Sequence, residues 1–452
     1  MSIPENDEVS SMDNKTIKKS HDVSVEKSSP DEEQDGGQCE ETEVSGYGSK
    51  LTHPWLCVLA TFFMFVNAWG LTQVFGLFQE FYIQTRLQDT SPSDISWIGS
   101  IQVFLVITAG TFTGPLFDAG YLRPLLVVGC ALLVLGMATL SIATQYYSIF
   151  LAQGVAVGLG GGLIYVPSLS FISTIFPDKT RPLAIGSVSS GGSVGGIIFA
   201  FMLRQLIPSI GFSWAVRSVA LVNLLLSAVA LAILMPQRIQ PPANRRAVVD
   251  LRVVCEPNFL FFAIALLLNY IAFYIPAFFL PTFATTSLGQ SRDFGILTLV
   301  FVSIGSFLGR TIPLVAAIYI GAVQVYLAGT VVAIVVLFAW MSVRSVGGVV
   351  AFAIIYGLVS GVLVAAPSAA MSHPTLSPTM DVIGSRMGVV WLFAGVGVLI
   401  GSPVAGALAG IHPEHIDFRP AQSFAGAVVT AASLFLIKPL LSVVRYNKTT
   451  KP

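Results

Sequence analysis

Apolar residues dominate the chain from Trp55 to Val444, in blocks that short clusters of proline, glycine and charge separate. A helix needs about twenty apolar residues to cross the hydrocarbon core of a bilayer. The pattern therefore predicts twelve spanning helices and an all-α membrane protein. The expected spans are 54–79, 94–117, 122–144, 147–175, 182–206, 213–235, 258–284, 293–316, 320–341, 347–371, 382–410 and 420–443. An even number of crossings places both ends of the chain on one side of the membrane.

The longest polar interruption of this pattern is the segment 236–257, PQRIQPPANRRAVVDLRVVCEP, with four arginines against Asp250 and Glu256. It leaves 182 residues before it and 187 after it within the apolar region. A basic segment between two equal apolar halves is typical of a cytoplasmic linker. The expected organisation is an acidic tail (1–53), a six-helix bundle (54–235), the linker (236–257), a second six-helix bundle (258–444) and a short tail (445–452).

The composition supports membrane insertion, since 54% of the residues are hydrophobic and only 11% are charged. Soluble domains carry roughly 25% charged residues. The formal net charge is zero, yet residues 1–53 alone hold 13 acidic residues and 5 lysines. This tail has no apolar stretch of the kind found in signal peptides, and we expect it to be disordered.

Of the 19 basic residues beyond the tail, 12 fall in cytoplasmic segments if both ends of the chain lie inside, and six fall outside. The positive-inside rule therefore predicts cytoplasmic termini. No retention signal is evident, so the plasma membrane is the default location.

The sequence offers no cofactor site. Its four cysteines are far apart, which provides neither a disulfide framework nor a metal-binding spacing. His412-Pro-Glu-His415 lacks the H-E-x-x-H order of a helical zinc site, and no G-x-x-x-x-G-K-[ST] loop for ATP is present. We expect neither an enzyme nor an ATP-driven pump. The expected partners are the lipid bilayer and a small organic solute, with no nucleic acid and no obligate protein partner.

The two apolar halves share a pattern. Gly161 and Pro167-Ser168 recur as Gly361 and Pro367-Ser368, at an offset of 200 residues. Repeated halves imply a pseudo-two-fold axis with a central cavity between them.

Three motifs carry a resemblance to a known family. GPLFDAGYLRPLLVVG (114–129) resembles the signature loop of the major facilitator superfamily, with Asp118 and Arg123 at its turn. DKTRPLAIGSVSSGGSVGG (178–196) is similar to the monocarboxylate-porter signature, and GSRMGVVWLFAGVGVLIGSPVAGAL (384–408) is similar to its fungal branch. The resemblance implies the major facilitator superfamily fold, with 12 transmembrane helices in two pseudo-symmetric six-helix bundles. It also implies transport of a small organic solute by alternating access.

The sequence departs from this family at two charged positions. Gln73 stands where animal members place a lysine, and Ser306 replaces an aspartate one turn before Arg310. Arg310 matches the family arginine and lies well inside its span. It either pairs with an anionic substrate or extends its head group to water near the cytoplasmic end. Since Glu80 and Asp94 lie at span ends, proton coupling and simple facilitated diffusion both stay open.

Further polar and aromatic residues are candidates to face the cavity, or else to form interhelical hydrogen bonds and packing contacts. The candidate substrate-binding residues are Arg310, Asn67, Gln73, Gln102, Tyr165, Asn269, Tyr270, Tyr274 and Trp391. The candidate gating residues, all expected on the cytoplasmic face, are Asp118, Arg123, Lys179, Arg181 and Arg386. Pro276 and Pro281 predict that the seventh span is broken.

The substrate class stays open between a small carboxylate taken up, a vitamin-like anion such as riboflavin, and an exported metabolite. The replacement of the cavity lysine and aspartate favours a larger or less charged solute than lactate. A function of another class is a nutrient receptor that has a transporter fold and signals through its acidic tail.

Overall fold

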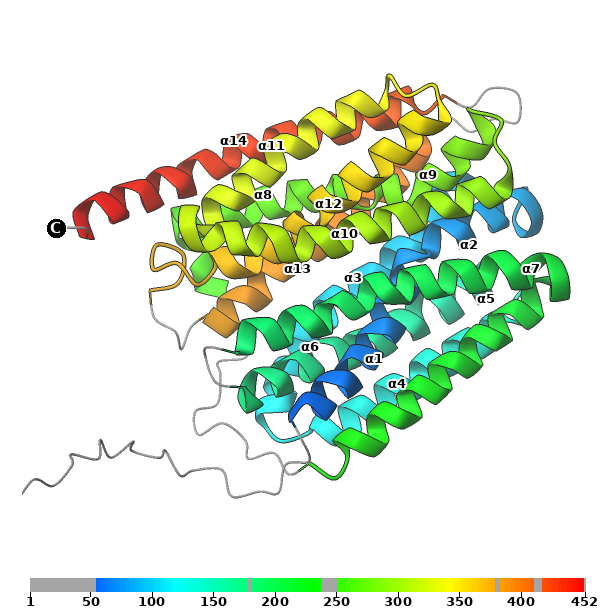
Figure 1. Cartoon of the computed structure of the whole chain (residues 1–452), viewed down its shortest axis with the longest axis horizontal. Coiled ribbons are helices and arrows are strands. Elements are labelled where there is room, and N and C mark those ends of the chain that lie inside the picture. The colour runs from blue at the N-terminus through cyan, green and yellow to red at the C-terminus, as the bar shows by residue number, and fades with distance from the viewer. Residues whose placement is uncertain (1–53, 177–179, 238–250, 379–382, 410–416, 451–452) are drawn as a thin grey trace, which may run out of the picture. The chain divides into compact units, whose positions relative to one another are not determined.

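The computed structural model describes residues 54–176, 180–237, 251–378, 383–409 and 417–450. All regular elements within these ranges are helical (Figure 1). In chain order they are α1 (Pro54–Gln73), α2 (Phe75–Phe81), η1 (Tyr82–Arg86), α3 (Pro92–Asp118), α4 (Leu122–Leu140), α5 (Tyr146–Ile149), η2 (Phe150–Val157), α6 (Gly158–Ile175), α7 (Arg181–Leu234), η3 (Leu251–Cys255), α8 (Pro257–Phe273), α9 (Ile275–Thr286), α10 (Arg292–Ile320), α11 (Ala322–Trp340), α12 (Val346–Ala370), α13 (Ile383–Leu408) and α14 (Arg419–Thr450). The acidic tail, most of the linker, Lys179 and His412 to His415 lie outside the described residues.

Eleven helical stretches of the described chain are long and apolar enough to cross a membrane. One of them, Leu183–Leu234, contains 52 residues and would measure roughly 78 Å as a straight helix, far more than the ~30 Å of a bilayer core. Its backbone is non-helical at Gly211, where φ is 79°, and α7 reverses direction there (Figure 1). Counted as two crossings, α7 brings the described helices to the predicted twelve.

Several helix ends differ from the prediction. The first crossing runs on through α2 and η1 to Arg86, and α14 continues to Thr450, beyond the predicted end of the last span. The predicted break in the seventh crossing lies at Tyr274, because Pro276 occupies the first turn of α9, whereas Pro281 lies inside that helix. Proline is tolerated in the first turn, where its missing N–H would have no partner in any case.

The predicted repeat extends over most of each half. α3 and α10 begin at residues 92 and 292, and α4 and α11 span 122–140 and 322–340. The first and seventh crossings are interrupted at Val74 and Tyr274, again 200 residues apart. These matching positions confirm two pseudo-symmetric bundles.

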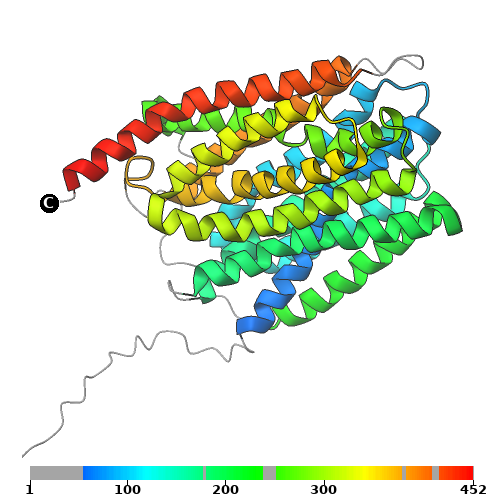
Figure 2. The same ribbon diagram turned by 45° about the horizontal axis from the view of Figure 1, so that its top comes forward.

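Within the first half, α7 packs against α1 and α4, and α6 packs against α3 and α4. In the second half, α12 packs against α10 and α11, and α8 packs against α13 and α14. Among the described helices the halves meet mainly where α3 packs on α13, α7 on α10 and α2 on α9. Figure 2 shows α14 and α11 at one edge of the molecule and the second part of α7 at the opposite edge.

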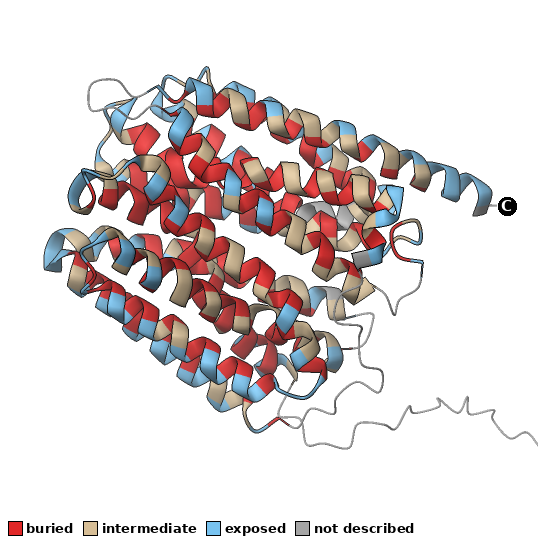
Figure 3. Cartoon of the chain, turned by 180° about the vertical axis from the view of Figure 1, so that it is seen from behind, coloured by how far each residue is buried: buried red, intermediate tan, exposed pale blue. Residues whose placement is uncertain are grey.

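Burial follows this arrangement. The inner faces of the helices are buried (Figure 3). Large apolar side chains are exposed on α4, the second part of α7, α11 and α14. Leu225, Val335 and Leu434 are more than half exposed. Apolar outer faces of this kind are suited to lipid, which gives an exposed leucine the environment that a soluble protein provides in its core.

Candidate functional site

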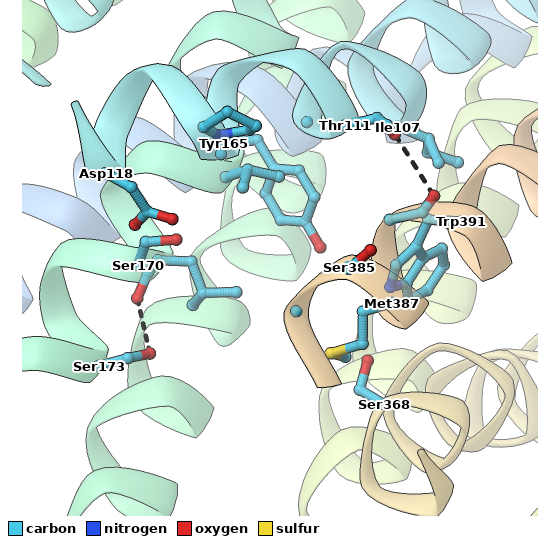
Figure 4. A pocket seen from close by; sticks show the side chains of 17 residues that line it. Ile107, Thr111, Asp118, Tyr165, Ser170, Ser173, Ser368, Ser385, Met387 and Trp391 are labelled. Carbon is cyan, nitrogen blue, oxygen red and sulfur yellow. Dashed lines mark hydrogen bonds between the residues drawn. The ribbon is translucent and has the colours of Figure 1, made fainter. Parts of the chain in front are cut away.

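A cavity of about 250 Å³ lies between α3 and α6 of the first half and α12 and α13 of the second half (Figure 4). We call the side where α3 and α6 end and α8 begins the linker side, and the opposite side the far side. The cavity lies toward the linker side, because the last turns of α3, α6 and α12 and the first turns of α13 line it. Its lining residues are Ile107, Gly110, Thr111, Gly114, Pro115, Asp118, Tyr165, Val166, Leu169, Ser170, Ser173, Ser368, Gly384, Ser385, Met387, Gly388 and Trp391.

The lining combines hydroxyls with aromatic and apolar surface. Tyr165 and Trp391 face the cavity from opposite halves, and the Tyr165 hydroxyl is directed toward Ser385 (Figure 4). Thr111 donates a hydrogen bond of 3.4 Å to the backbone oxygen of Gly388, and this bond links α3 to α13 at the cavity wall. A pocket with apolar walls and a few polar groups suits a solute that is itself partly apolar.

Arg310 does not line the cavity itself but interacts with Tyr165, which does. Its Nη1 donates a hydrogen bond of 2.6 Å to the backbone oxygen of Ser189 on α7, whereas its Nε has no partner among the described residues. The guanidinium interacts electrostatically with the hydroxyls of Tyr274, Tyr165 and Tyr270. A cation at this depth is costly without a counter-ion, and among the described residues Arg310 contacts a backbone carbonyl and three tyrosine hydroxyls. The site can therefore accept an anion.

The aromatic residues around Arg310 include two contacting pairs, one from each half. The Trp391 ring meets Tyr270 edge-on at 5.7 Å, and the Tyr165 ring meets Trp69 edge-on at 5.1 Å. A β-carbon at Gly192 would lie 2.8 Å from Trp69 and 3.5 Å from Nη1 of Arg310, so the glycine gives both residues room. Sequence analysis missed Trp69, although it lies one helical turn before Gln73 in the same span.

The far side is closed by aromatic contacts between the halves. The rings of Phe75 and Phe278 lie 4.6 Å apart, and a β-carbon at Gly76 would overlap the backbone oxygen of Ala277. Ser93 on α3 donates a hydrogen bond of 2.9 Å to the backbone oxygen of Pro403 on α13. Within the part of the chain that the structure describes, these contacts close the way from the cavity to the far side.

Four of the predicted binding residues lie elsewhere. Asn67 donates to Ser227 Oγ at 2.9 Å and to the backbone oxygen of Asn223, and Asn269 donates to the Tyr326 hydroxyl at 2.9 Å. Both asparagines thus hold helices within one half. Gln102 is buried with no described partner for its amide. Gln73 lies beside Gly196, which also contacts Ser303 of α10, so Gln73 is at the interface of the halves.

The predicted gating residues lie on the linker side as far as the structure describes them. Arg386 forms a bidentate ion pair with Glu256, which lies at the start of α8. Arg123 donates to the backbone oxygen of Gln237 at 3.3 Å, and Arg181 donates to that of Phe176. Asp118 is 3% exposed and lines the cavity. These arginine contacts stay within one half, so they do not close the linker side in this conformation.

Two pseudo-symmetric helical bundles with a cavity between them are the architecture of a membrane transporter. The chain belongs to the major facilitator superfamily, since a family profile described as Major Facilitator Superfamily matches residues 55–401. The predicted family and fold are thus confirmed, and the protein is a transporter and not an enzyme.

Several fungal transporters are similar to this chain. The MFS-type transporter pynF of Aspergillus niger is 31% identical over 393 residues, 86% of this chain and 90% of that protein. The Agnestins efflux protein AgnL12 of Paecilomyces divaricatus is 32% identical over 392 residues, 86% of this chain and 87% of that protein. The Aspyridones efflux protein apdF of Emericella nidulans is 30% identical over 376 residues, 83% of this chain and 75% of that protein.

Among solved structures, a mutant of the nucleoside transporter NupG matches with a TM-score of 0.67 and 14% sequence identity, covering 85% of this chain and 99% of that chain. At this identity the match confirms the fold alone. The resemblance to monocarboxylate porters stays a prediction.

Proposed function

We propose that the protein exports an amphipathic organic anion by alternating access. The observation that carries the proposal is Arg310, whose guanidinium bonds a backbone carbonyl, leaves Nε without a described partner, and interacts with three tyrosine hydroxyls. An anionic group on the solute would supply the missing counter-charge. The aromatic surface of Tyr165 and Trp391 would hold the apolar part of the same solute.

The cavity argues for a solute larger than lactate. Its volume of about 250 Å³ approaches the lower end of the ~300–1,000 Å³ range of small-molecule pockets. Its walls offer two aromatic rings and several hydroxyls, a mixture suited to a ring-bearing organic acid. The binding set that we propose is Arg310 with Tyr165, Tyr270, Tyr274, Trp391 and Trp69; contact of Asn67, Gln73, Gln102 or Asn269 with the solute stays a prediction.

Two observations support export over uptake. The relatives AgnL12 and apdF are named as efflux proteins for agnestins and aspyridones, and the cavity lies toward the linker side, which the charge bias predicts to be cytoplasmic. Solute would then enter from the cytoplasm and leave at the far side. The plasma membrane remains the proposed location. Uptake of a monocarboxylate is the second candidate, because the motifs at 178–196 and 384–408 resemble those porters.

Gating would exchange contacts between the two sides. In this conformation the halves touch on the far side, while Arg123 and Arg386 hold contacts within their own halves. We propose that Asp118, Arg123, Lys179, Arg181 and Arg386 form contacts between the halves when the linker side closes. The far-side aromatic contacts would then separate.

The test is transport by purified protein in liposomes, with a panel of simple carboxylates, riboflavin and aromatic organic acids, each beside its neutral amide analogue. Arg310→Gln should lower saturable transport of the preferred acid by about tenfold or more, the size of a lost charge-assisted bond of ~1.5–3 kcal/mol. Arg217→Gln is the matched control, because Arg217 is also an arginine of a long helix but contacts the Trp214 ring and Ser141 instead of the tyrosines around Arg310. Transport of every acid at wild-type rates by the Arg310→Gln variant would overturn the anion site.

A further inference from the structure

The polar groups of the cavity are unevenly distributed. Among the described residues, Asp118 is the only acidic or basic side chain that lines the cavity. In the close-up view, Asp118, Ser170 and Ser173 lie together on one side of Tyr165, and Trp391 lies on the other side (Figure 4). We call Asp118, Ser170 and Ser173 the acceptor cluster.

Two neighbouring helices of the first half position the acceptor cluster. Asp118 is the last residue of α3, and Ser170 and Ser173 are three residues apart on α6. Residues at this spacing lie on one face of a helix, and α3 packs directly against α6. The cluster therefore keeps its arrangement without a contribution from the second half.

Ser173 has already used its hydroxyl proton. It donates a hydrogen bond of 2.9 Å to the backbone oxygen of Leu169, and a hydroxyl has one proton but two lone pairs. A further partner in the cavity must therefore donate to Ser173.

Asp118 imposes the same requirement on a partner. An ionised carboxylate accepts hydrogen bonds and donates none, and its two oxygens offer about four acceptor positions. The carboxylate can therefore hold a donor from the solute beside its other contacts. An ether or a second carboxylate, which can only accept, would find no donor on Asp118 or Ser173.

The charge of Asp118 also determines which way an acid lies in the cavity. The residue is 3% exposed, so solvent screens its charge only weakly. A carboxylate of the solute is repelled there and attracted to Arg310, whose described contacts are a backbone carbonyl and tyrosine hydroxyls. The part of the solute that meets the acceptor cluster is therefore remote from its acid group.

An aromatic and apolar wall adjoins the acceptor cluster. Tyr165, Val166 and Leu169 line the cavity from α6, the helix that also carries Ser170 and Ser173. A ring system on the solute can pack against this wall. The order of groups along the solute would then be an acid, a ring and a hydrogen-bond donor.

We propose that the acceptor cluster binds a hydroxyl group of the solute, and that the exported compound is a hydroxylated aromatic acid. Its acid group points toward Arg310, its ring packs on Tyr165, and its hydroxyl donates to Ser173 or Asp118. The inference rests on the proposed function, because it uses the same cavity and the same anion site. Asp118 would bind solute in this conformation and take part in gating when the linker side closes.

A protonated amine would also donate to the cluster. It would bring a second charge into a cavity with aromatic and apolar walls, and removing a charge from water is costly. A hydroxyl supplies the donor without that cost, so the structure favours the hydroxyl. The experiment therefore includes a charged analogue as a separate arm.

The experiment is equilibrium binding to the purified protein near neutral pH, which requires no turnover. The probes are para-hydroxycinnamic acid, its para-methoxy ether and cinnamic acid, because the ether keeps the oxygen but loses the proton. The hydroxyl compound should bind about three- to tenfold more tightly than the other two, the effect of one net hydrogen bond. Ser173→Ala should lower this preference by about twofold or more. Asp118→Asn should nearly abolish it, since an amide can donate to the ether as well as accept.

Thr174→Ala is the matched control. Thr174 follows Ser173 on α6 and donates to the backbone oxygen of Phe171 at 2.7 Å, but it is exposed and does not line the cavity. This variant should keep the wild-type preference. If Asp118→Asn fails to fold, Ser173→Ala alone decides the role of the cluster.

Four results would overturn the proposal. They are equal wild-type affinities for the hydroxyl compound and the ether, an unchanged preference in the variants of the cluster that fold, no binding of any of the three probes, and tighter binding of para-(aminomethyl)cinnamic acid than of the hydroxyl compound. The last result would assign the cluster to a cationic group.

Arg310→Gln separates this inference from the proposed function. It should weaken the binding of all three acids by a similar factor and keep the preference for the hydroxyl, because Arg310 acts on the opposite end of the solute. Unchanged affinities in Arg310→Gln would overturn the anion site, while a wild-type preference for the hydroxyl over the ether would still support the acceptor cluster.

Discussion

Gly309 of α10 lies directly against the backbone oxygen of Leu358 on α12, so that a β-carbon at Gly309 would overlap this oxygen. Gly401 of α13 has the same relationship to the backbone oxygen of Ile271 on α8. Without glycine, the paired helices would have to separate. Close approach through small residues is the usual way in which membrane helices gain packing energy, because lipid gives them no hydrophobic reason to associate.

Gly309→Ala and Gly401→Ala should therefore destabilise the protein, each by about 1–3 kcal/mol, the typical cost of overpacking. The measurement is the thermal midpoint of the purified protein in detergent. Gly186→Ala is the matched control, because it lies within helix α7 and its β-carbon would meet nothing within 4 Å. Alanine favours the helix over glycine by about 1 kcal/mol, so the control should be neutral or stabilising. Equal midpoints for all three variants would contradict the packing argument.

The position of the cavity predicts which residues react with thiol reagents. Ser385 and Ser402 are both on α13, but Ser385 lines the cavity whereas Ser402 is 1% exposed and does not. In a variant without native cysteines, Ser385→Cys should react with a membrane-impermeant thiosulfonate added to the linker side. Ser402→Cys should react at least tenfold more slowly, because a buried thiol reacts only when the structure opens locally.

This labelling also tests the orientation in the membrane. In inside-out vesicles the linker side faces the reagent if the termini are cytoplasmic, so Ser385→Cys should react there and stay protected in sealed right-side-out vesicles. The reverse pattern would place the termini outside. Fast reaction of Ser402→Cys would mean that the far side is open under these conditions.

The sequence was sufficient for the number and order of the crossings, because each depends on local hydrophobicity and on breaks at proline and glycine. It also located Arg310 and Tyr165, since the family motif and an isolated polar residue in a span are visible without coordinates. It could not decide where Asn67 and Asn269 point. The sequence pattern around an asparagine in a span is the same whether its side chain faces a cavity or a neighbouring helix. Its direction depends on how each helix is rotated in the bundle.

Glu80 and Glu256 show a second limit of sequence reasoning. Glu80 lies just beyond the predicted first span, 54–79, yet the helix continues to Arg86 and the carboxylate is buried. Glu256 was grouped with the linker, but it pairs with Arg386 of α13, 130 residues later. Contacts between residues so far apart in sequence depend on how the helices assemble, which hydrophobic periodicity does not encode.

Asn67 allows a test of its structural role. Asn67→Leu keeps the approximate volume but removes the bonds to Ser227 and to the backbone of Asn223. The thermal stability should fall by about 0.6–2 kcal/mol, the range for hydrogen bonds between membrane helices. Affinity for the transported acid should be unchanged. Ser227→Ala combined with Asn67→Leu should cost less than the two single changes together, since both remove the same bond. A loss of affinity without a loss of stability would contradict this and indicate that Asn67 contacts the solute.

His373 predicts a pH-dependent contact at the end of the chain. It follows α12, its ring meets Tyr446 of α14 edge-on at 5.5 Å, and the backbone N–H of Thr375 donates to its Nδ1 at 3.3 Å. Burial lowers the pKa of His373 below its ordinary value of 6.5, although a hydrogen bond with Asn447 acts in the opposite direction. The packed state therefore favours the neutral ring, whose Nδ1 is free to accept.

Because the pKa is lower in the packed state, the contact is fully favoured above about pH 6.5 and is lost as the pH falls through the lowered pKa of the packed ring. Hydrogen exchange over residues 440–450, corrected for the intrinsic effect of pH, should show less protection at about pH 5.5 than at about pH 7.5. His373→Phe keeps a ring against Tyr446 but cannot be protonated, so its protection should not change with pH. The same loss of protection in that variant would assign the effect to another group.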